Sequence, residues 1–187
     1  MNTDPEKLTI VHHPHPVLRK VAQPVESVTP EVQAICTRML ELMHEAPGVG
    51  LAAPQVGLEL RLFVANATGD PQDDMVFINP LITVEGKATE DMEEGCLSLP
   101  GINASIRRPK AVTIEATDID GNRFRATSDD LPARIWQHEN DHLDGVMIPD
   151  HIAATKRQLL QGKLRDIGMG KVKVDYRMRF LKSKKRG

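Results

Sequence analysis

The feature that most constrains this chain is the pattern His138-Glu139-x-x-His142, whose two imidazoles act together only if the stretch is helical. On an α-helix, residues four apart lie on one face, so both histidines can point at one metal ion. The flanking residues support a helix, because Pro132 is typical of a helix start and Gly145 of a helix end. We therefore expect a helix that carries a metal site.

Both histidines continue an apolar stripe on that helix. Leu131 and Ile135 precede His138 and His142 at helical spacing, which predicts that this face is buried. In a chain with seven histidines, a pattern this short can also arise from packed or solvated side chains. Burial favours the metal, because each nitrogen of a buried imidazole needs a partner.

The residues after the helix do not supply the third metal ligand at the positions where known zinc patterns place it. Catalytic zinc sites usually have three protein ligands, and the metzincin pattern would place the third at position 148, which is Ile148. The alternative zincin arrangement needs a downstream glutamate, and no Glu follows Glu139. His151 stays open as a ligand, although Gly145 and Pro149 separate it from the helix.

Cys96 is the favoured third ligand. It lies between Gly95 and Pro100, in a segment whose irregular backbone could direct the sulfur inward. An inert buried thiol is the alternative for Cys96. The other cysteine, Cys36, falls on the apolar face of a predicted helix and is most simply a small buried hydrophobic residue.

Length and composition describe an ordinary globular protein. The chain has 187 residues, 40% of them hydrophobic and 27% charged, which suits one domain with a sizeable core. Two distant cysteines form no disulfide framework and indicate a reducing compartment. The N-terminus lacks an apolar signal segment and no 18-residue apolar run follows, so we expect a cytoplasmic protein that contacts neither membrane nor DNA.

Charge separates the C-terminus from the rest of the chain. Residues 171–187 contain eight Lys or Arg against a single acid, Asp175. We assign residues 1–170 to a single catalytic domain and residues 171–187 to a basic, flexible tail. Such a tail could contact RNA or an anionic surface, and a solvated terminus explains it equally well.

The remaining patterns predict an α+β protein. A long N-terminal helix begins after Thr29 and ends at Pro47, and residues 152–164 form an amphipathic C-terminal helix. Residues 48–55, rich in small side chains, are most simply a structural turn. Strands are expected at residues 60–65, 75–82 and 112–116, and a short final strand at residues 172–176.

Three separated motifs resemble those of the peptide deformylase family. Residues 48–55 match G-x-G-L-A-A-P-Q, residues 94–98 match E-G-C-L-S, and residues 137–143 match Q-H-E-x-D-H-L. They occur in the family's order and at suitable separations, and the resemblance runs from about residue 8 to residue 148. It implies an α+β fold with antiparallel sheets packed around the central H-E-x-x-H helix.

The resemblance also implies roles for single residues. Glu139 would be the general base and acid, and two groups would stabilise an oxyanion, the Gln55 side chain and the Leu97 N–H. The metal ligands would be Cys96, His138 and His142.

Four residues are expected beside the substrate. Val49 and Gly50 match the family's substrate loop, whereas Leu131 and Ile135 come from our helical spacing, which predicts an apolar pocket edge for a methionine side chain. Arg134, one turn before His138, would either guide peptide carbonyl groups or face solvent.

The expected activity is metal-dependent removal of the formyl group from the N-terminal formylmethionine of newly made polypeptides. The resemblance suggests Fe²⁺ as the working ion, replaceable by Zn²⁺, Ni²⁺ or Co²⁺, and zinc also agrees with the ligand types. The basic tail could contact the ribosome transiently. A zincin-type metallopeptidase and a non-catalytic metal-binding module of the same fold are the alternatives.

Overall fold

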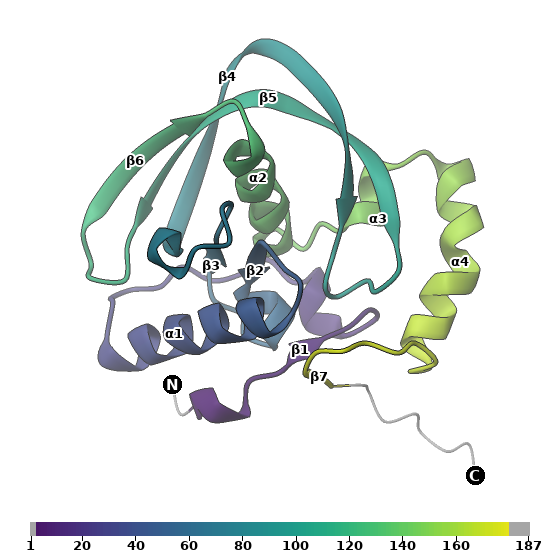
Figure 1. Ribbon diagram of the computed structural model, residues 1–187, viewed down its shortest axis with the longest axis horizontal. Helices are drawn as coiled ribbons and strands as arrows, with labels where there is room; N and C mark the ends of the chain where they lie inside the picture. Colours follow the sequence, from purple (N-terminus) through teal and green to yellow (C-terminus); the bar gives the residue numbers. More distant parts are fainter. Residues whose placement is uncertain (1–2, 180–187) are drawn as a thin grey trace.

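The computed structural model describes residues 3–179, which form a five-stranded antiparallel sheet, a two-stranded sheet and four α-helices. Figure 1 shows the large sheet rising as an arch over the central helix α2, with helix α1 beneath it and helix α4 along one side. The predicted α+β fold, with an antiparallel sheet around the H-E-x-x-H helix, is confirmed.

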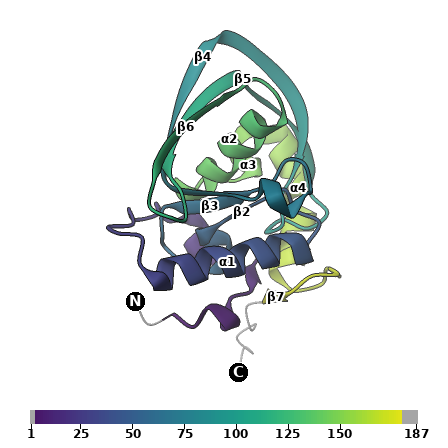
Figure 2. The same cartoon turned by 60° about the vertical axis from the view of Figure 1, so that its left-hand side comes forward.

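The large sheet has the strand order β2-β3-β4-β5-β6, and every neighbouring pair is antiparallel. Its long strands β4 and β5 form a curved ribbon that, together with β6, wraps around α2 (Figure 2). The bounds are β2 Gly50–Ala52, β3 Leu62–Ala65, β4 Met75–Gly95, β5 Asn103–Thr117 and β6 Arg123–Ser128.

The helices lie on both sides of the short strands. Helix α1 packs its apolar face against β2 and β3, with Cys36 fully buried. Burial raises the pKa of the Cys36 thiol to about 12, which leaves it an inert packing residue. The helix bounds are α1 Pro30–Glu45, α2 Leu131–Leu143, α3 Ile148–His151 and α4 Ala154–Gly168.

Helix α2 is seated on the sheet by aromatic packing. Asp130 caps its N-terminus, and Trp136 lies in the same apolar cluster as Phe63 and Phe77. The Phe77 ring centroid is 4.6 Å from that of Phe63 and 5.8 Å from that of Trp136. Aromatic pairs at these separations add to the stability gained from area burial alone, so the helix is fixed against the sheet.

In the N-terminal half, the start of α1 agrees with the prediction and the structure of residues 48–55 does not. Helix α1 begins at Pro30, as predicted, because the Thr29 hydroxyl accepts a hydrogen bond from the Val32 amide. The turn expected at residues 48–55 is wrong: Gly50–Ala52 is an edge strand and Ala53–Val56 a 3₁₀ turn. Small residues fit there because the strand passes close to the side chains of α2.

The strands of the arch are longer than expected. Strand β4 continues from residue 82 to Gly95, and β5 begins at Asn103 instead of residue 112. Most β4 side chains between residues 83 and 93 are exposed or half-buried, so the extension lacks the alternation of apolar and polar residues by which a strand is recognised.

The C-terminal elements are also shifted. Helix α4 starts at Ala154, later than the expected residue 152, and the apolar Leu159 on it is 83% exposed, so its packing is only weakly amphipathic. The strand expected at residues 172–176 is wrong in position. Strand β7, Met178–Arg179, is parallel to β1, Ile10–Val11, while residues 172–176 precede it without strand pairing.

The alternation behind that expectation is nevertheless present in the side chains. Val172, Val174 and Tyr176 are half-buried, and the intervening Lys173 and Asp175 are exposed. Residues 171–179 therefore pack against the domain, whereas residues 180–187 of the predicted tail lie outside the described residues. Between residues 3 and 179, no helix has the length and apolar character needed to cross a membrane.

Candidate metal centre and its cavity

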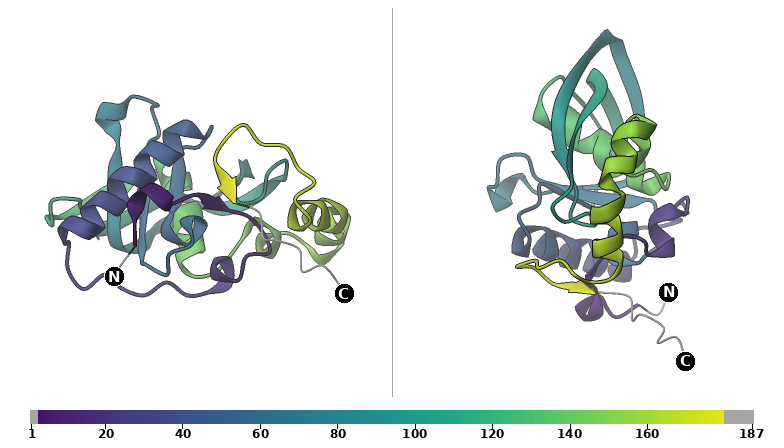
Figure 3. Two further views of the ribbon diagram at one scale, coloured as in Figure 1. Left: turned by 90° about the horizontal axis from the view of Figure 1, so that it is seen from below. Right: turned by 90° about the vertical axis from the view of Figure 1, so that its right-hand side faces the viewer.

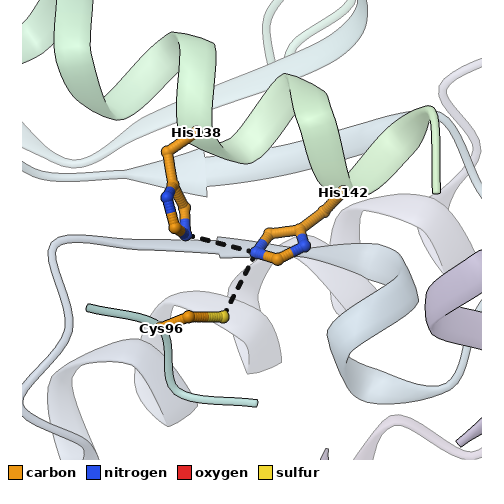
Figure 4. Close-up of side chains that lie close together, drawn as sticks. All are labelled: Cys96, His138 and His142. Atoms are coloured by element: carbon orange, nitrogen blue, oxygen red, sulfur yellow. Dashed lines mark hydrogen bonds between the residues drawn. The ribbon is translucent and has the colours of Figure 1, made fainter. Parts of the chain in front are cut away.

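Three side chains converge between the sheet and α2. Cys96 follows the end of β4, and His138 and His142 extend from successive turns of α2 (Figure 4). The His142 Nε2 atom is 3.3 Å from His138 Nε2 and 3.4 Å from Cys96 Sγ. These ligand atoms all lie within 4.8 Å of one another, so the three residues form a group that could hold one metal ion.

The donor set fits a tetrahedral ion. With metal–nitrogen bonds of about 2.0–2.1 Å and a metal–sulfur bond of about 2.3 Å, tetrahedral ligands stand about 3.3 Å (nitrogen to nitrogen) and about 3.6 Å (nitrogen to sulfur) apart. The observed 3.3 Å and 3.4 Å are close to both values. Two facing imidazole nitrogens at this distance also need either a hydrogen atom or a metal ion between them.

His151, the other candidate ligand, lies outside this group. Its Nε2 atom is 2.6 Å from the Asp141 carboxylate. Among residues 3–179, the cluster able to hold a metal consists of Cys96, His138 and His142.

A buried ion cluster orients His138. The Glu94 carboxylate lies 2.9 Å from His138 Nδ1 and accepts two hydrogen bonds from Arg108, at 2.6 and 2.9 Å. Arg134 donates a third, at 3.1 Å. Because Nδ1 is engaged by Glu94, the Nε2 atom of His138 is the one that faces Cys96 and His142.

The surroundings set the charge state of these groups. Burial opposes ionisation of Glu94, but the hydrogen bonds from Arg108 and His138 outweigh it and hold the pKa of Glu94 below its ordinary range. Burial likewise opposes a charge on His138, yet Cys96 and Glu94 raise its pKa well above the ordinary value. The pKa of His142 is lowered by burial and by the neighbouring His138.

Arg134 has a structural partner that the sequence did not reveal. It is 7% exposed, donates to Glu94, and also donates to the backbone carbonyl groups of Ile106 and Glu90. Arg134 therefore neither faces solvent nor offers a free guanidinium, although it contributes to the cavity wall.

Glu139 is buried beside the ligand cluster. Burial raises the pKa of its carboxyl group to about 7; His138 opposes this shift, and Glu94 adds to it. Within the described part of the chain, its Oε2 atom has no hydrogen-bond partner, which suits a carboxylate meant for a transient ligand. A pKa near neutrality is what a group needs to accept and return a proton.

Strand β2 passes directly over Glu139. A Cβ atom added to Gly50 would lie 2.5 Å from Glu139 Oε1, well inside van der Waals contact. Glycine at this position therefore leaves the space that the carboxyl group occupies.

Gln55 and Leu97 flank the thiol. The Gln55 Oε1 atom accepts a hydrogen bond from the Ala52 amide at 2.7 Å, which directs its NH₂ group toward Cys96 Sγ, 3.6 Å away, and Ser98 Oγ, 3.4 Å away. Leu97 is the next residue after Cys96, and its carbonyl accepts a hydrogen bond from Tyr176. Both proposed oxyanion donors thus belong to the immediate surroundings of Cys96.

A cavity of about 530 Å³ opens over the cluster. Cys96, His138, Glu139, Gln55 and Leu97 line it, and so do the four residues expected beside the substrate. Those four are Val49, Gly50, Leu131 and Ile135. The sequence did not indicate a further stretch of the wall, residues 173–176, which come from the predicted tail.

Comparison with known proteins shows which family this chain resembles along most of its length. The family model described as polypeptide deformylase matches residues 7–158, most of the chain. This chain belongs to the peptide deformylase family. The peptide deformylase of Rhodopirellula baltica is 42% identical over 171 residues, covering 90% of this chain and 82% of that protein. The one from Cytophaga hutchinsonii is also 42% identical, with 91% and 96% covered.

Solved peptide deformylase structures share the fold. The Legionella pneumophila enzyme superposes with a TM-score of 0.82 at 38% identity, covering 88% of this chain and 96% of that one. A plant peptide deformylase superposes with a TM-score of 0.84 at 34% identity, covering 95% and 100%.

The closeness of β2 to Glu139 generates a prediction for this deformylase. Gly50→Ala should displace the Glu139 carboxyl group and lower kcat/KM for deformylation by about 10²-fold, since a positioned general base contributes that much or more. Steady-state kinetics on metal-loaded protein measures the effect.

Gly162→Ala is the matched control. Gly162 lies in α4, and apart from its chain neighbours and its own helix backbone no atom of residues 3–179 lies within 4 Å of an added Cβ, so this variant should keep full activity and unfold at an equal or higher temperature. Equal activity of both variants would contradict the assigned closeness of β2 and Glu139.

Proposed function

We propose that this protein is a metal-dependent hydrolase that removes the formyl group from the N-terminal formylmethionine of newly made polypeptides and releases formate. The observation that carries the proposal is the juxtaposition of the Cys96, His138 and His142 ligand cluster with the buried Glu139 in one cavity. Membership of the peptide deformylase family supports the reaction class.

A metal ion bound at this cluster would supply concentrated positive charge. A divalent ion held by Cys96, His138 and His142 would act as a Lewis acid and bring the pKa of a coordinated water toward neutrality. We propose Fe²⁺ as the working ion on the strength of the family resemblance, with Zn²⁺, Ni²⁺ and Co²⁺ as replacements. Metal analysis of protein purified without oxygen would decide among them.

Glu139 moves the proton. As the water oxygen attacks the formyl carbon, the Glu139 carboxylate accepts a proton from the water. It then donates that proton to the methionine nitrogen as the carbon–nitrogen bond breaks, so that a neutral amine and formic acid leave, and the acid releases its proton to the solvent as formate. The pKa of Glu139, raised to about 7 by burial, supports both directions of transfer near neutral pH.

Gln55 and Leu97 would stabilise the negative charge that develops on the formyl oxygen. The Gln55 NH₂ group is held toward Cys96 by its bond to the Ala52 amide, so it needs no reorganisation during the reaction. The Leu97 N–H is the backbone donor next to the thiol ligand. Two such donors on one oxygen are typical of acyl-transfer sites.

The methionine side chain would contact Val49, Leu131 and Ile135. Ile135 is buried, while Val49 and Leu131 are 48% and 37% exposed, as expected for residues at the edge of an opening. Their apolar surface would be covered by the substrate side chain.

The test of this function is formate release from formyl-Met-Ala-Ser by nickel-loaded protein, with Glu139→Ala as the variant. Wild type should release formate, and the variant should lose about 10²–10⁴-fold in kcat while it still binds one nickel ion. Absence of formate release from fully metallated wild type would overturn the proposal. Digestion of casein by that sample would instead favour the zincin peptidase, and neither activity would favour a metal-binding module.

We further propose a cytoplasmic protein that meets its substrate at the ribosome through the basic tail, residues 171–187, whose last eight residues include Lys182, Lys184, Lys185 and Arg186. Ribosomal RNA is an anionic surface, and basic clusters bind such surfaces in a salt-dependent manner. Deletion of residues 180–187 should therefore reduce co-sedimentation with ribosomes at low salt without lowering kcat on the tripeptide. Unchanged co-sedimentation would contradict the proposed ribosome contact.

A further inference from the structure

After α4 the chain turns back toward the reaction cavity. Figure 3, like Figure 1, shows the segment running from the end of α4 beneath the molecule to β1. Residues 173–176 of this segment line the same cavity as His138 and Glu139. The family model ends at residue 158, so this part of the wall lies outside the matched region.

The segment is fixed along its length. At its start, Val172 packs against the apolar cluster that includes Leu99 and Ile106. At its end, β7 pairs with β1, and the Ile10 amide donates a hydrogen bond of 3.1 Å to the Arg177 carbonyl. The residues between these anchors are therefore held against the domain.

Tyr176 connects this segment to the centre. It is the only tyrosine of the chain, and its hydroxyl donates a hydrogen bond of 2.8 Å to the Leu97 carbonyl. Burial raises the pKa of Tyr176 to about 12, with a smaller contribution from Cys96. The phenol thus stays protonated and remains a donor throughout the working pH range.

The Tyr176 hydrogen bond helps to fix Leu97, because both peptide planes that adjoin Leu97 are restrained. The plane that contains the Leu97 N–H also contains the Cys96 carbonyl, which accepts from the Leu99 amide at 2.9 Å. The next plane contains the Leu97 carbonyl, held by Tyr176. Because peptide units are rigid, restraint of both planes limits the φ and ψ angles of Leu97 and so the direction of its N–H.

We propose that Tyr176 is a positioning residue for deformylation, which holds the Leu97 N–H in the direction that an oxyanion donor needs. The proposal rests on the function proposed above. A donor that is free to rotate must be reoriented during the reaction, whereas a fixed donor stabilises the transition state without that cost. The tail segment would in this way belong to the catalytic domain.

Tyr176→Phe tests the proposal, because it removes one hydroxyl and keeps the ring that packs against the apolar cluster to which α1 contributes. On formyl-Met-Ala-Ser with nickel-loaded protein, kcat should fall about tenfold, less than the loss of a whole donor, while KM stays within about twofold. Hydrogen exchange of the backbone amides at residues 96–98 should become faster, and the unfolding temperature should stay close to that of wild type.

Arg177→Ala is the matched control, since the Arg177 side chain is exposed and its interaction with the rest of residues 3–179 is made by the backbone carbonyl. This variant should equal wild type in kcat and in exchange. Unchanged kcat in Tyr176→Phe, or a loss accompanied by faster exchange throughout the molecule and a lower unfolding temperature, would overturn the positioning role. Wild type without formate release would instead refute the proposed function itself.

Discussion

The structure depends on one buried carboxylate. Glu94 is almost fully enclosed, and a charge in that environment is tolerated only when it is paired and hydrogen-bonded. Arg108 comes from β5, Arg134 and His138 come from α2, and Glu94 itself comes from the end of β4. The cluster thus connects the long ribbon to the central helix, and it does so two residues before the thiol ligand Cys96.

This arrangement explains how distant segments produce one centre. The engagement of His138 Nδ1 by Glu94 turns Nε2 toward Cys96 and His142, and the end of β4 brings the sulfur to the same point. Strand β2 closes the opposite side, with Gly50 against Glu139. The candidate ligands, the proposed base and the proposed oxyanion donors are therefore held by the surrounding fold, which is the condition for preorganised electrostatic catalysis.

The residues that gather around Cys96 could be predicted from the sequence because they belong to short-range patterns. The spacing of His138 and His142 predicts a helix, and the lack of a downstream ligand directs attention to Cys96. The family motifs supplied Gln55 and Leu97, and the cavity contains both.

Other parts depend on contacts between distant residues, and no local pattern indicates them. Residues 83–93 of β4 have no buried face, so the sequence pattern did not indicate the full 21-residue length of this strand. Arg108 and Arg134 resemble ordinary surface cations until the fold places them on Glu94. The alternation through Tyr176 was recognised as a strand pattern, but the basic composition of residues 171–187 suggested a solvated terminus, so the packing of this stretch against the cavity was not predicted.

The role of Glu94 is tested by comparing the nickel dissociation constants of Glu94→Gln and Asp91→Asn. Both variants exchange a carboxylate for an amide on β4, but Asp91 is exposed, whereas Glu94 orients His138. If the buried carboxylate organises the centre, Glu94→Gln should weaken nickel binding about 10–100-fold and Asp91→Asn should leave it unchanged. If folded Glu94→Gln protein bound nickel as tightly as Asp91→Asn, the buried carboxylate would not organise the centre.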